Sequence, residues 1–202
     1  MVRYEGEWKD DKACGKGKLI HIDGDIYSGE WKDDKAEGYG VYIHSNGTTY
    51  EGEWKDDKQH GIGKEIWKDG AVYNGKFEFG KKCGKGKIIF SDGSFYEGEF
   101  SENNIDGFGT YVWSDGKTYI GYWKSNKMDG KGKITWNDGR MYEGEYEDDK
   151  KNGYGVYKWS DGRVYEGNWL NGRQDGEGYY TNKEGVRKRG VWENGNRIKW
   201  YD

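Results

Sequence analysis

The chain repeats one arrangement of aromatic, glycine and charged positions every 23 residues. Tyrosine opens eight successive units, glycine follows two residues later, and an aromatic residue follows four residues later. The opening tyrosines are Tyr4, Tyr27, Tyr50, Tyr73, Tyr96, Tyr119, Tyr142 and Tyr165, and Lys188 stands in the ninth place. Segments such as 119–123 therefore alternate residue type with period two, which predicts β-strands. A fixed period of this length is typical of a repeat architecture.

The short connection that closes each unit sets the register of the strands on either side of it. A two-residue Asp-Gly turn would scatter the aromatic side chains over both faces of the sheet. A three-residue loop, such as 114–116, instead pairs Tyr111 with Tyr119 and Gly109 with Gly121. Such a loop also needs a left-handed residue in its last place, which is glycine here. The pattern therefore predicts three-residue loops.

The connection inside each unit has a longer spacing, and we expect a six-residue loop such as 124–129. This loop would place Tyr119 opposite Ile134 and would put Trp123 between two glycines, Gly107 and Gly130. The register of the three-residue loops gives the reverse face apolar cross-strand pairs, which are favourable neighbours in a sheet. These pairs are Ile20 with Ile26, Ile66 with Val72, Ile89 with Phe95, and Thr135 with Met141.

In this register, large rings lie beside strands that have no side chains of their own. We expect the rings to lie flat over the glycine backbone, as in the aromatic rescue of glycine. One aromatic side chain buries ~150–250 Å², so about two rings per unit would offset much of the ordering entropy without a second layer. The predicted fold is all-β: an elongated, solenoid-like, single-layer antiparallel meander of about seventeen strands. Its stability would be a sum over neighbouring units.

The pattern Y-x-G-E-W-(x)6-G-x-G-(x)6-[DN]-G resembles the MORN repeat ("membrane occupation and recognition nexus"). The resemblance covers eight full units within residues 1–187 and a partial ninth in 188–202, which is expected to cap the C-terminal edge. It implies tandem β-hairpins. It also implies a role in cytoskeletal or ciliary assemblies such as axonemal radial spokes, or beside membranes, with partner helices held in the groove of the sheet.

Composition narrows the possible functions. Charged residues make up 35% of the chain and hydrophobic residues only 32%, but the net charge is −4 and aromatics reach 17%. Balanced charge and abundant rings argue against disorder. A net acidic sheet lacks the positive field that nucleic acid requires. No apolar run has the length of a membrane span or secretory signal, so the simplest compartment is the cytoplasm.

No cluster of residues in the sequence suggests catalysis, a metal site or a cofactor site, and we expect a protein that is not an enzyme. Cys14 and Cys83 lie three units apart, too far for a disulfide or, with His60, for a metal cluster. His21 and His44 stand where other units carry an aromatic residue, and they are interpreted as packing substitutes. Pairs of aspartates within "KDDK" segments are interpreted as solvated loop tips.

The aromatic face is the main candidate for binding, because contiguous exposed rings are typical of partner sites. The candidate contact residues are Trp113, Trp123, Trp136, Trp159 and Trp169. A helix or an extended peptide would cover them. A thinner patch on the reverse face remains an alternative, where Tyr39, Ile62, Phe108 and Tyr154 replace the lysines of other units.

These observations favour a non-enzymatic scaffold that docks other proteins. One alternative is a phosphoinositide or membrane-surface module that uses a basic island, with Lys81, Lys82, Lys85 and Lys87 as candidate anion or lipid contacts. Most lysines have acidic neighbours, which weakens this alternative, since recruitment depends on unpaired cations. Another alternative is a regulatory segment of a larger enzyme such as a lipid kinase.

Overall fold

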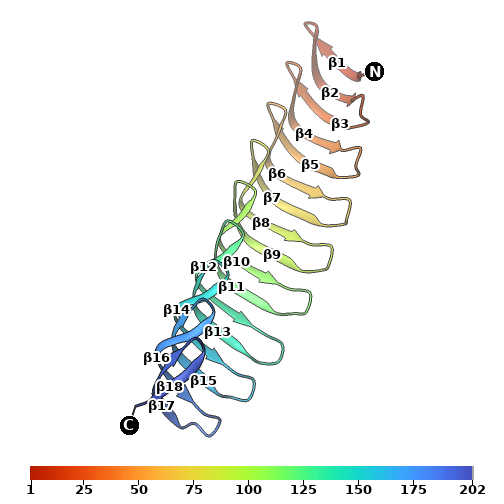
Figure 1. The fold of residues 1–202 in the computed structure, drawn as a ribbon. Coiled ribbons are helices and arrows are strands. Elements are labelled where there is room, and N and C mark those ends of the chain that lie inside the picture. The colour runs from red at the N-terminus through yellow and green to blue at the C-terminus, as the bar shows by residue number, and fades with distance from the viewer. Residues whose placement is uncertain (202) are drawn as a thin grey trace. The chain divides into compact units, whose positions relative to one another are not determined.

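The computed structural model describes residues 1–201, and within them every regular element is a β-strand. The chain divides into two compact units, Met1–Asn104 and a second that begins at Ile105. Eighteen strands lie in the described residues, one more than the sequence predicted, and Figure 1 labels them in chain order. The additional strand is the last one, which lies in the atypical C-terminal segment.

The first unit is an antiparallel meander whose strands pair in sequence order. Long strands alternate with shorter ones, and each long strand ends at a three-residue loop. The strands are β1 (Arg3–Lys9), β2 (Lys12–Ile20), β3 (Ile26–Lys32), β4 (Lys35–Ile43), β5 (Thr49–Lys55), β6 (Lys58–Ile66), β7 (Val72–Glu78), β8 (Lys81–Ile89) and β9 (Phe95–Ser101).

The second unit repeats the same arrangement. Its strands are β10 (Asn104–Val112), which starts on the last residue of the first unit, β11 (Thr118–Lys124), β12 (Lys127–Thr135), β13 (Met141–Glu147), β14 (Lys150–Lys158), β15 (Val164–Leu170), β16 (Arg173–Thr181), β17 (Arg187–Glu193) and β18 (Asn196–Trp200). The all-β antiparallel fold is therefore confirmed.

The three-residue loops have the predicted register. Between β10 and β11, Tyr111 pairs with Tyr119 and Gly109 with Gly121. Gly116 closes the loop with a φ of +84°, and its N–H donates to the Trp113 carbonyl at 2.8 Å. The four predicted apolar pairs on the reverse face are also present. Side-chain parity and one left-handed glycine were sufficient to define this connection.

The prediction of a six-residue loop inside each repeat is wrong. Between β11 and β12 only two residues, Ser125 and Asn126, form the turn, with φ of 47° and 68°. Two left-handed residues are the signature of a type I′ hairpin turn. Consequently Trp123 lies opposite Met128 and not opposite Gly130. The predicted contact of Trp123 with Gly107, across the other register, is correct.

A bulge explains why the prediction failed on one side of Trp123 only. Gly121 still pairs with Gly132, as predicted, so the register shifts between Gly121 and Trp123. The second strand of the hairpin takes up two extra residues at this point, and Gly130 adopts a φ of +92°. Bulges of this kind absorb additional residues without ending the strand. A long loop and a bulged hairpin place the same number of residues between Gly121 and Gly132, so the sequence does not distinguish them.

The paired acids are not merely solvated. In three of the turns the second aspartate, Asp34, Asp57 or Asp149, accepts a hydrogen bond from a strand N–H 21 residues earlier: Asp34 accepts from the Ala13 N–H at 2.7 Å. The backbone N–H of Asp34 donates to the Ala13 carbonyl at 3.1 Å, so the two repeats are joined by a pair of bonds. Asn103 and Asn126 make the same side-chain bond where they replace aspartate. These turns therefore connect successive repeats.

Candidate functional site

The innermost layer of the aromatic face consists of the tyrosines that open each repeat. Seven of the eight are at most 2% exposed, and the exception is Tyr4 in the first strand. The Tyr119 hydroxyl donates to the Tyr122 carbonyl at 3.0 Å, and burial raises the pKa of this phenol well above its usual range. A Cβ atom at Gly121 or Gly132 would lie within 2.5 Å of the Tyr119 oxygen. The tyrosine ring thus occupies the space that glycine leaves, as predicted.

A second ring, four residues after each tyrosine, closes this layer. The ring of Tyr119 meets Trp123 at 5.1 Å and an interplanar angle of 85°, and meets Tyr146 of the next repeat at 5.3 Å and 89°. Edge-to-face pairs of this geometry stabilise by ~0.5–1.5 kcal/mol beyond burial. In Trp169 the indole N–H also donates to the Gly155 carbonyl at 3.1 Å. These rings form the hydrophobic core of the single layer.

The five tryptophans predicted to contact a partner fall into two groups. Trp123 and Trp169 belong to the core and are each only 7% exposed, so they have little surface to offer. Trp113, Trp136 and Trp159 are half-buried and lie one row further out, next to the three-residue loops. The sequence did not separate the groups, since both contain indoles on the same face.

The outer row is organised by neighbouring rings and cations. Trp113 lies 4.6 Å from Tyr111, and Trp159 lies 4.8 Å from Tyr157, measured between ring centroids. The cation just beyond each loop lies over its own tryptophan. Lys117, Arg140 and Arg163 are 3.9, 5.3 and 5.3 Å from the centroids of Trp113, Trp136 and Trp159. Cation–π contacts at exposed sites stabilise by only ~0.5–1 kcal/mol each, so the outer indoles are held less firmly than the rings of the core.

A cavity of about 280 Å³ opens on this face in the second unit. It is lined by Lys151, Tyr157 and Trp159 of one repeat, by Trp169, Gly172, Arg173 and Gln174 of the next, and by Gly195 of the partial ninth. Two of the predicted tryptophans therefore meet here, one from the outer row and one from the core. Lys151 was not among the predicted site residues, although the sequence places it on the aromatic face.

The basic island is mostly neutralised by acids. Lys81 pairs with Glu102, and Lys87 pairs with Glu97 at 2.9 Å. Lys85 lies opposite Glu99 in the register of β8 and β9. Lys82 projects onto the aromatic face, where its ammonium contacts Glu65 at 2.5 Å and both side chains are about 15% exposed. The four lysines are thus divided between the two faces.

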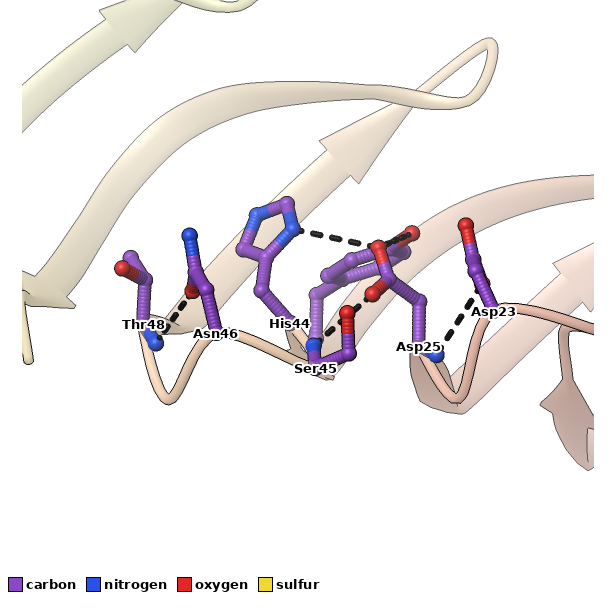
Figure 2. Close-up of polar contacts among 7 residues, drawn as sticks. Asp23, Asp25, His44, Ser45, Asn46 and Thr48 are labelled. Carbon is purple, nitrogen blue, oxygen red and sulfur yellow. Dashed lines mark hydrogen bonds and ion pairs between the residues drawn. The ribbon is translucent and has the colours of Figure 1, made fainter.

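In the first unit, Asp25 organises the row that holds the two histidines. Figure 2 shows its carboxylate accepting from the Ser45 N–H at 2.8 Å and facing the His44 ring nitrogen at 3.2 Å. The Tyr42 hydroxyl also donates to it, at 2.8 Å. These bonds, above all that from Ser45, hold the pKa of Asp25 well below its usual range. The His44 ring packs against Tyr42 with a centroid distance of 4.6 Å and an interplanar angle of 56°, consistent with its interpretation as a packing substitute.

The reverse face carries a separate apolar surface in the second unit. Phe108 and Tyr154, both predicted, are joined by Ile120 and Tyr122, and all four are 45–52% exposed. They line a cavity of about 410 Å³. In the first unit Tyr39 and Ile62 are 51% and 64% exposed. This patch is larger than the sequence indicated, because Ile120 and Tyr122 were not included.

No helix of the length and apolarity needed to cross a membrane occurs in residues 1–201. The same residues contain no cluster of three or more His, Cys, Asp or Glu side chains arranged to hold a metal ion. Both cysteines are free thiols.

Comparison with known proteins identifies the repeat. The family model for the MORN repeat matches eight consecutive segments: residues 4–26, 27–49, 50–72, 73–95, 96–118, 119–139, 142–162 and 165–187. No curated protein matches the chain in sequence. Among solved structures, the wild-type TCP10 domain of Danio rerio CPAP is similar, with a TM-score of 0.50 and 15% identity over 99% of this chain and 94% of that one.

The same Danio rerio domain in complex with a peptide of STIL has a TM-score of 0.52 and 14% identity, over 93% of this chain and 83% of that one. At these identities the likeness shows a shared fold.

Proposed function

Because this chain belongs to the MORN-repeat family, we propose that it is a protein-interaction scaffold that docks a peptide segment of a partner along its aromatic face. The observation that carries the proposal is the half-buried row formed by Trp113, Trp136 and Trp159. The core rings beneath them are already closed by edge-to-face contacts. The outer indoles therefore keep surface that the fold itself does not bury.

A docked segment would gain most of its affinity from these indoles. Tryptophan is enriched among the residues that dominate binding energy, particularly where a pocket surrounds it. Trp159 is the best placed of the three, since it borders the cavity of about 280 Å³. A fold-level analogue supports a peptide ligand: the TCP10 domain of Danio rerio CPAP was solved with a peptide of STIL. An extended strand or a helix would both fit the geometry of a sheet face.

We further propose that the scaffold works in a cytoskeletal or ciliary assembly in the cytoplasm. This part rests on the MORN family assignment alone. Fluorescent tagging of the full chain in its native cells tests it: the signal should remain on filaments or at cilia after detergent extraction. A signal that is fully extracted would contradict this setting while leaving the scaffold proposal intact.

Photo-crosslinking tests which face binds. A photoreactive phenylalanine analogue replaces Trp159 on the aromatic face or Tyr154 on the reverse face of the full chain. We expect crosslinked partner peptides from the Trp159 position and none above background from the Tyr154 position. The reverse result would move the docking surface to the patch around Phe108 and Tyr122 and would refute the face assigned here.

Substitution gives a matched comparison. Trp113, Trp136 and Trp159 changed together to alanine should abolish binding of the synthetic partner peptide identified by crosslinking. Phe108, Tyr122 and Tyr154 changed together to serine should leave it unchanged, because these side chains point away from the proposed site. Both variants must retain the wild-type strand content by circular dichroism.

A further inference from the structure

Lys151 lies in a cage of aromatic rings. Its ammonium is 4.5 Å from the centroid of Tyr157, 4.9 Å from Trp169, 5.1 Å from Tyr142 and 5.7 Å from Trp136. The side chain comes from β14, directly opposite Tyr146 of β13. Rings at these distances attract a cation, but they offer no full negative charge.

The equivalent lysine three repeats earlier has a similar cage and, in addition, a counter-ion. Lys82 lies 4.8 Å from the centroid of Trp67 and 5.2 Å from that of Tyr73. Its ammonium also contacts the Glu65 carboxylate at 2.5 Å. The residue three repeats after Glu65 is Ile134, which is 6% exposed. The second unit therefore repeats the cage and the cation but replaces the acid with an aliphatic side chain.

The ammonium of Lys151 is consequently uncompensated. No ion pair to it occurs among residues 1–201. Burial, with a smaller contribution from Arg140, lowers the pKa of Lys151 to about 8. A charge removed from water without a partner destabilises the fold. The same unpaired ammonium would bind strongly to any anion that reaches it.

The cavity beside Lys151 gives such an anion access. Its volume of about 280 Å³ is at or below the ~300–1,000 Å³ typical of sites that enclose a whole small molecule. It fits one or two side chains of a longer ligand better. Trp159 and Trp169 on its walls would contact the apolar neighbours of an acidic residue.

We propose that Lys151 is the specificity-determining residue of the aromatic face, and that it receives a Glu or Asp carboxylate from an acidic peptide segment of the partner. The inference rests on the proposed function, since it names the chemistry of the segment that docks there. The partner acid takes the place that Glu65 holds internally beside Lys82.

The repeat itself supplies a decisive variant. Ile134→Glu places an acid at the position equivalent to Glu65, where it would neutralise Lys151 from within the chain. Lys151→Met removes the charge but keeps the length of the side chain. Lys150→Met is the matched control, because it removes the same charge from the exposed neighbouring residue.

A random 12-residue peptide library displayed on phage is selected against the full-length wild-type chain and each variant. Wild-type selections should yield peptides with one acidic residue at a fixed distance from an aromatic or large aliphatic residue. Replacing that acid by its amide in a synthetic peptide should weaken binding roughly 10- to 100-fold, since truncating one partner of a desolvated charge pair is costly. Lys150→Met should select the same motif.

The outcomes separate the two proposals. Two results would overturn the role of Lys151 and leave the aromatic docking face intact, provided that the selected peptides bind Trp159→Ala more weakly than wild type. The peptides selected by wild type could show no preference for an acidic residue, or the Lys151→Met and Ile134→Glu variants could both select the same acidic motif as wild type. A failure of wild-type protein to select any peptide, or selection of peptides that Trp159→Ala does not weaken, would refute the docking face and the Lys151 proposal together. Loss of the acidic preference on Ile134→Glu, with its fold intact, would support both.

Discussion

The glycine pairs under each tyrosine ring provide the most direct test of how this sheet is stabilised. In Gly121→Ala, the new Cβ would lie 2.5 Å from the Cα of Gly132, 2.7 Å from the Lys131 carbonyl oxygen and 2.5 Å from the hydroxyl oxygen of Tyr119. Two of these neighbours are backbone atoms of the paired strand, so they cannot rotate away. The ring of Tyr119 must therefore move, and the two strands must also shift apart locally.

The expected cost follows from what the ring gives up. Tyr119 is fully buried and donates to the Tyr122 carbonyl at 3.0 Å. Loss of that bond costs about 1 kcal/mol. Loss of much of the ring's burial costs roughly 1.5–3 kcal/mol, and overpacking strain adds about 1–3 kcal/mol. The reduced freedom of the unfolded chain returns about 0.4–1 kcal/mol, which leaves a net loss of roughly 2.5–6.5 kcal/mol.

Gly139→Ala is the control. Gly139 lies in a three-residue loop with a φ of +88° and open space around its Cβ position. Its substitution should cost only the left-handed strain, about 1–2 kcal/mol. Urea unfolding of the full chain, followed by tryptophan fluorescence and circular dichroism, measures both. A midpoint for Gly121→Ala no lower than that of Gly139→Ala would refute the shielding argument.

A double substitution identifies the cause. If the ring is the obstacle, Gly121→Ala should cost less in a Tyr119→Leu background than in wild type, because contacting residues are energetically coupled. Strictly additive losses would mean that the backbone contact with Gly132 alone accounts for the effect.

Three further predictions concern single side chains. The buried Tyr146 hydroxyl has no hydrogen-bond partner among residues 1–201, so Tyr146→Phe should stabilise the chain against urea by about 1 kcal/mol. Tyr142→Phe should destabilise it, because the Tyr142 hydroxyl donates to the Glu145 carbonyl at 2.9 Å; the opposite order of stabilities would show that the Tyr146 hydroxyl is not the unsatisfied group. Asp149 has a φ of 67° and its carboxylate accepts from the Met128 N–H at 2.8 Å, so Asp149→Asn should be tolerated while Asp149→Ala should cost roughly 1–3 kcal/mol. Equal thermal midpoints for the two variants would show that this hydrogen bond between repeats does not stabilise the fold. The folded pKa of Lys151 is about 8, below its ordinary 10.5, so the destabilisation by its charge is fully present below pH 8 and is lost as pH rises to about 10.5. Lys151→Met should therefore be more stable than wild type by about 3 kcal/mol at pH 7, and this difference should decline between pH 8 and 10.5. A stability difference independent of pH would exclude the buried charge as its cause.

Much of the fold could be predicted because the sequence is periodic and its parity is strict. Tyr111 and Tyr119 can share a face only if three residues separate their strands, and a glycine stands where that loop needs a left-handed residue. The bulge beside Gly130 could not be predicted in this way. A bulged hairpin and a longer loop consume the same number of residues. The hairpin turn also bonds to the preceding repeat, where the Asn126 N–H donates to the Ile105 carbonyl at 2.9 Å, and the spacing along the chain does not reveal that contact.

The candidate site was only partly predictable for a different reason. Trp113 and Trp123 are the same residue type on the same face, but one is half-buried and the other is in the core. Trp123 packs edge-to-face against the buried ring of Tyr119 at 5.1 Å, whereas Trp113 lies next to a three-residue loop and contacts Tyr111 and Lys117. Lys151 was missed although its signal was present: Ile134 stands where an earlier repeat has Glu65.

The amino-acid sequence by itself determined the repeat length, the strand-forming segments, the residues that share a face and the apolar pairs of the reverse side, since each depends on spacing along one chain. Tertiary structure alone decided which rings are enclosed, where a hairpin bulges and which cation lacks an acid. Those outcomes depend on contacts between repeats, where a ring or a charge is defined by the neighbour it meets in space and not by its own position in the period.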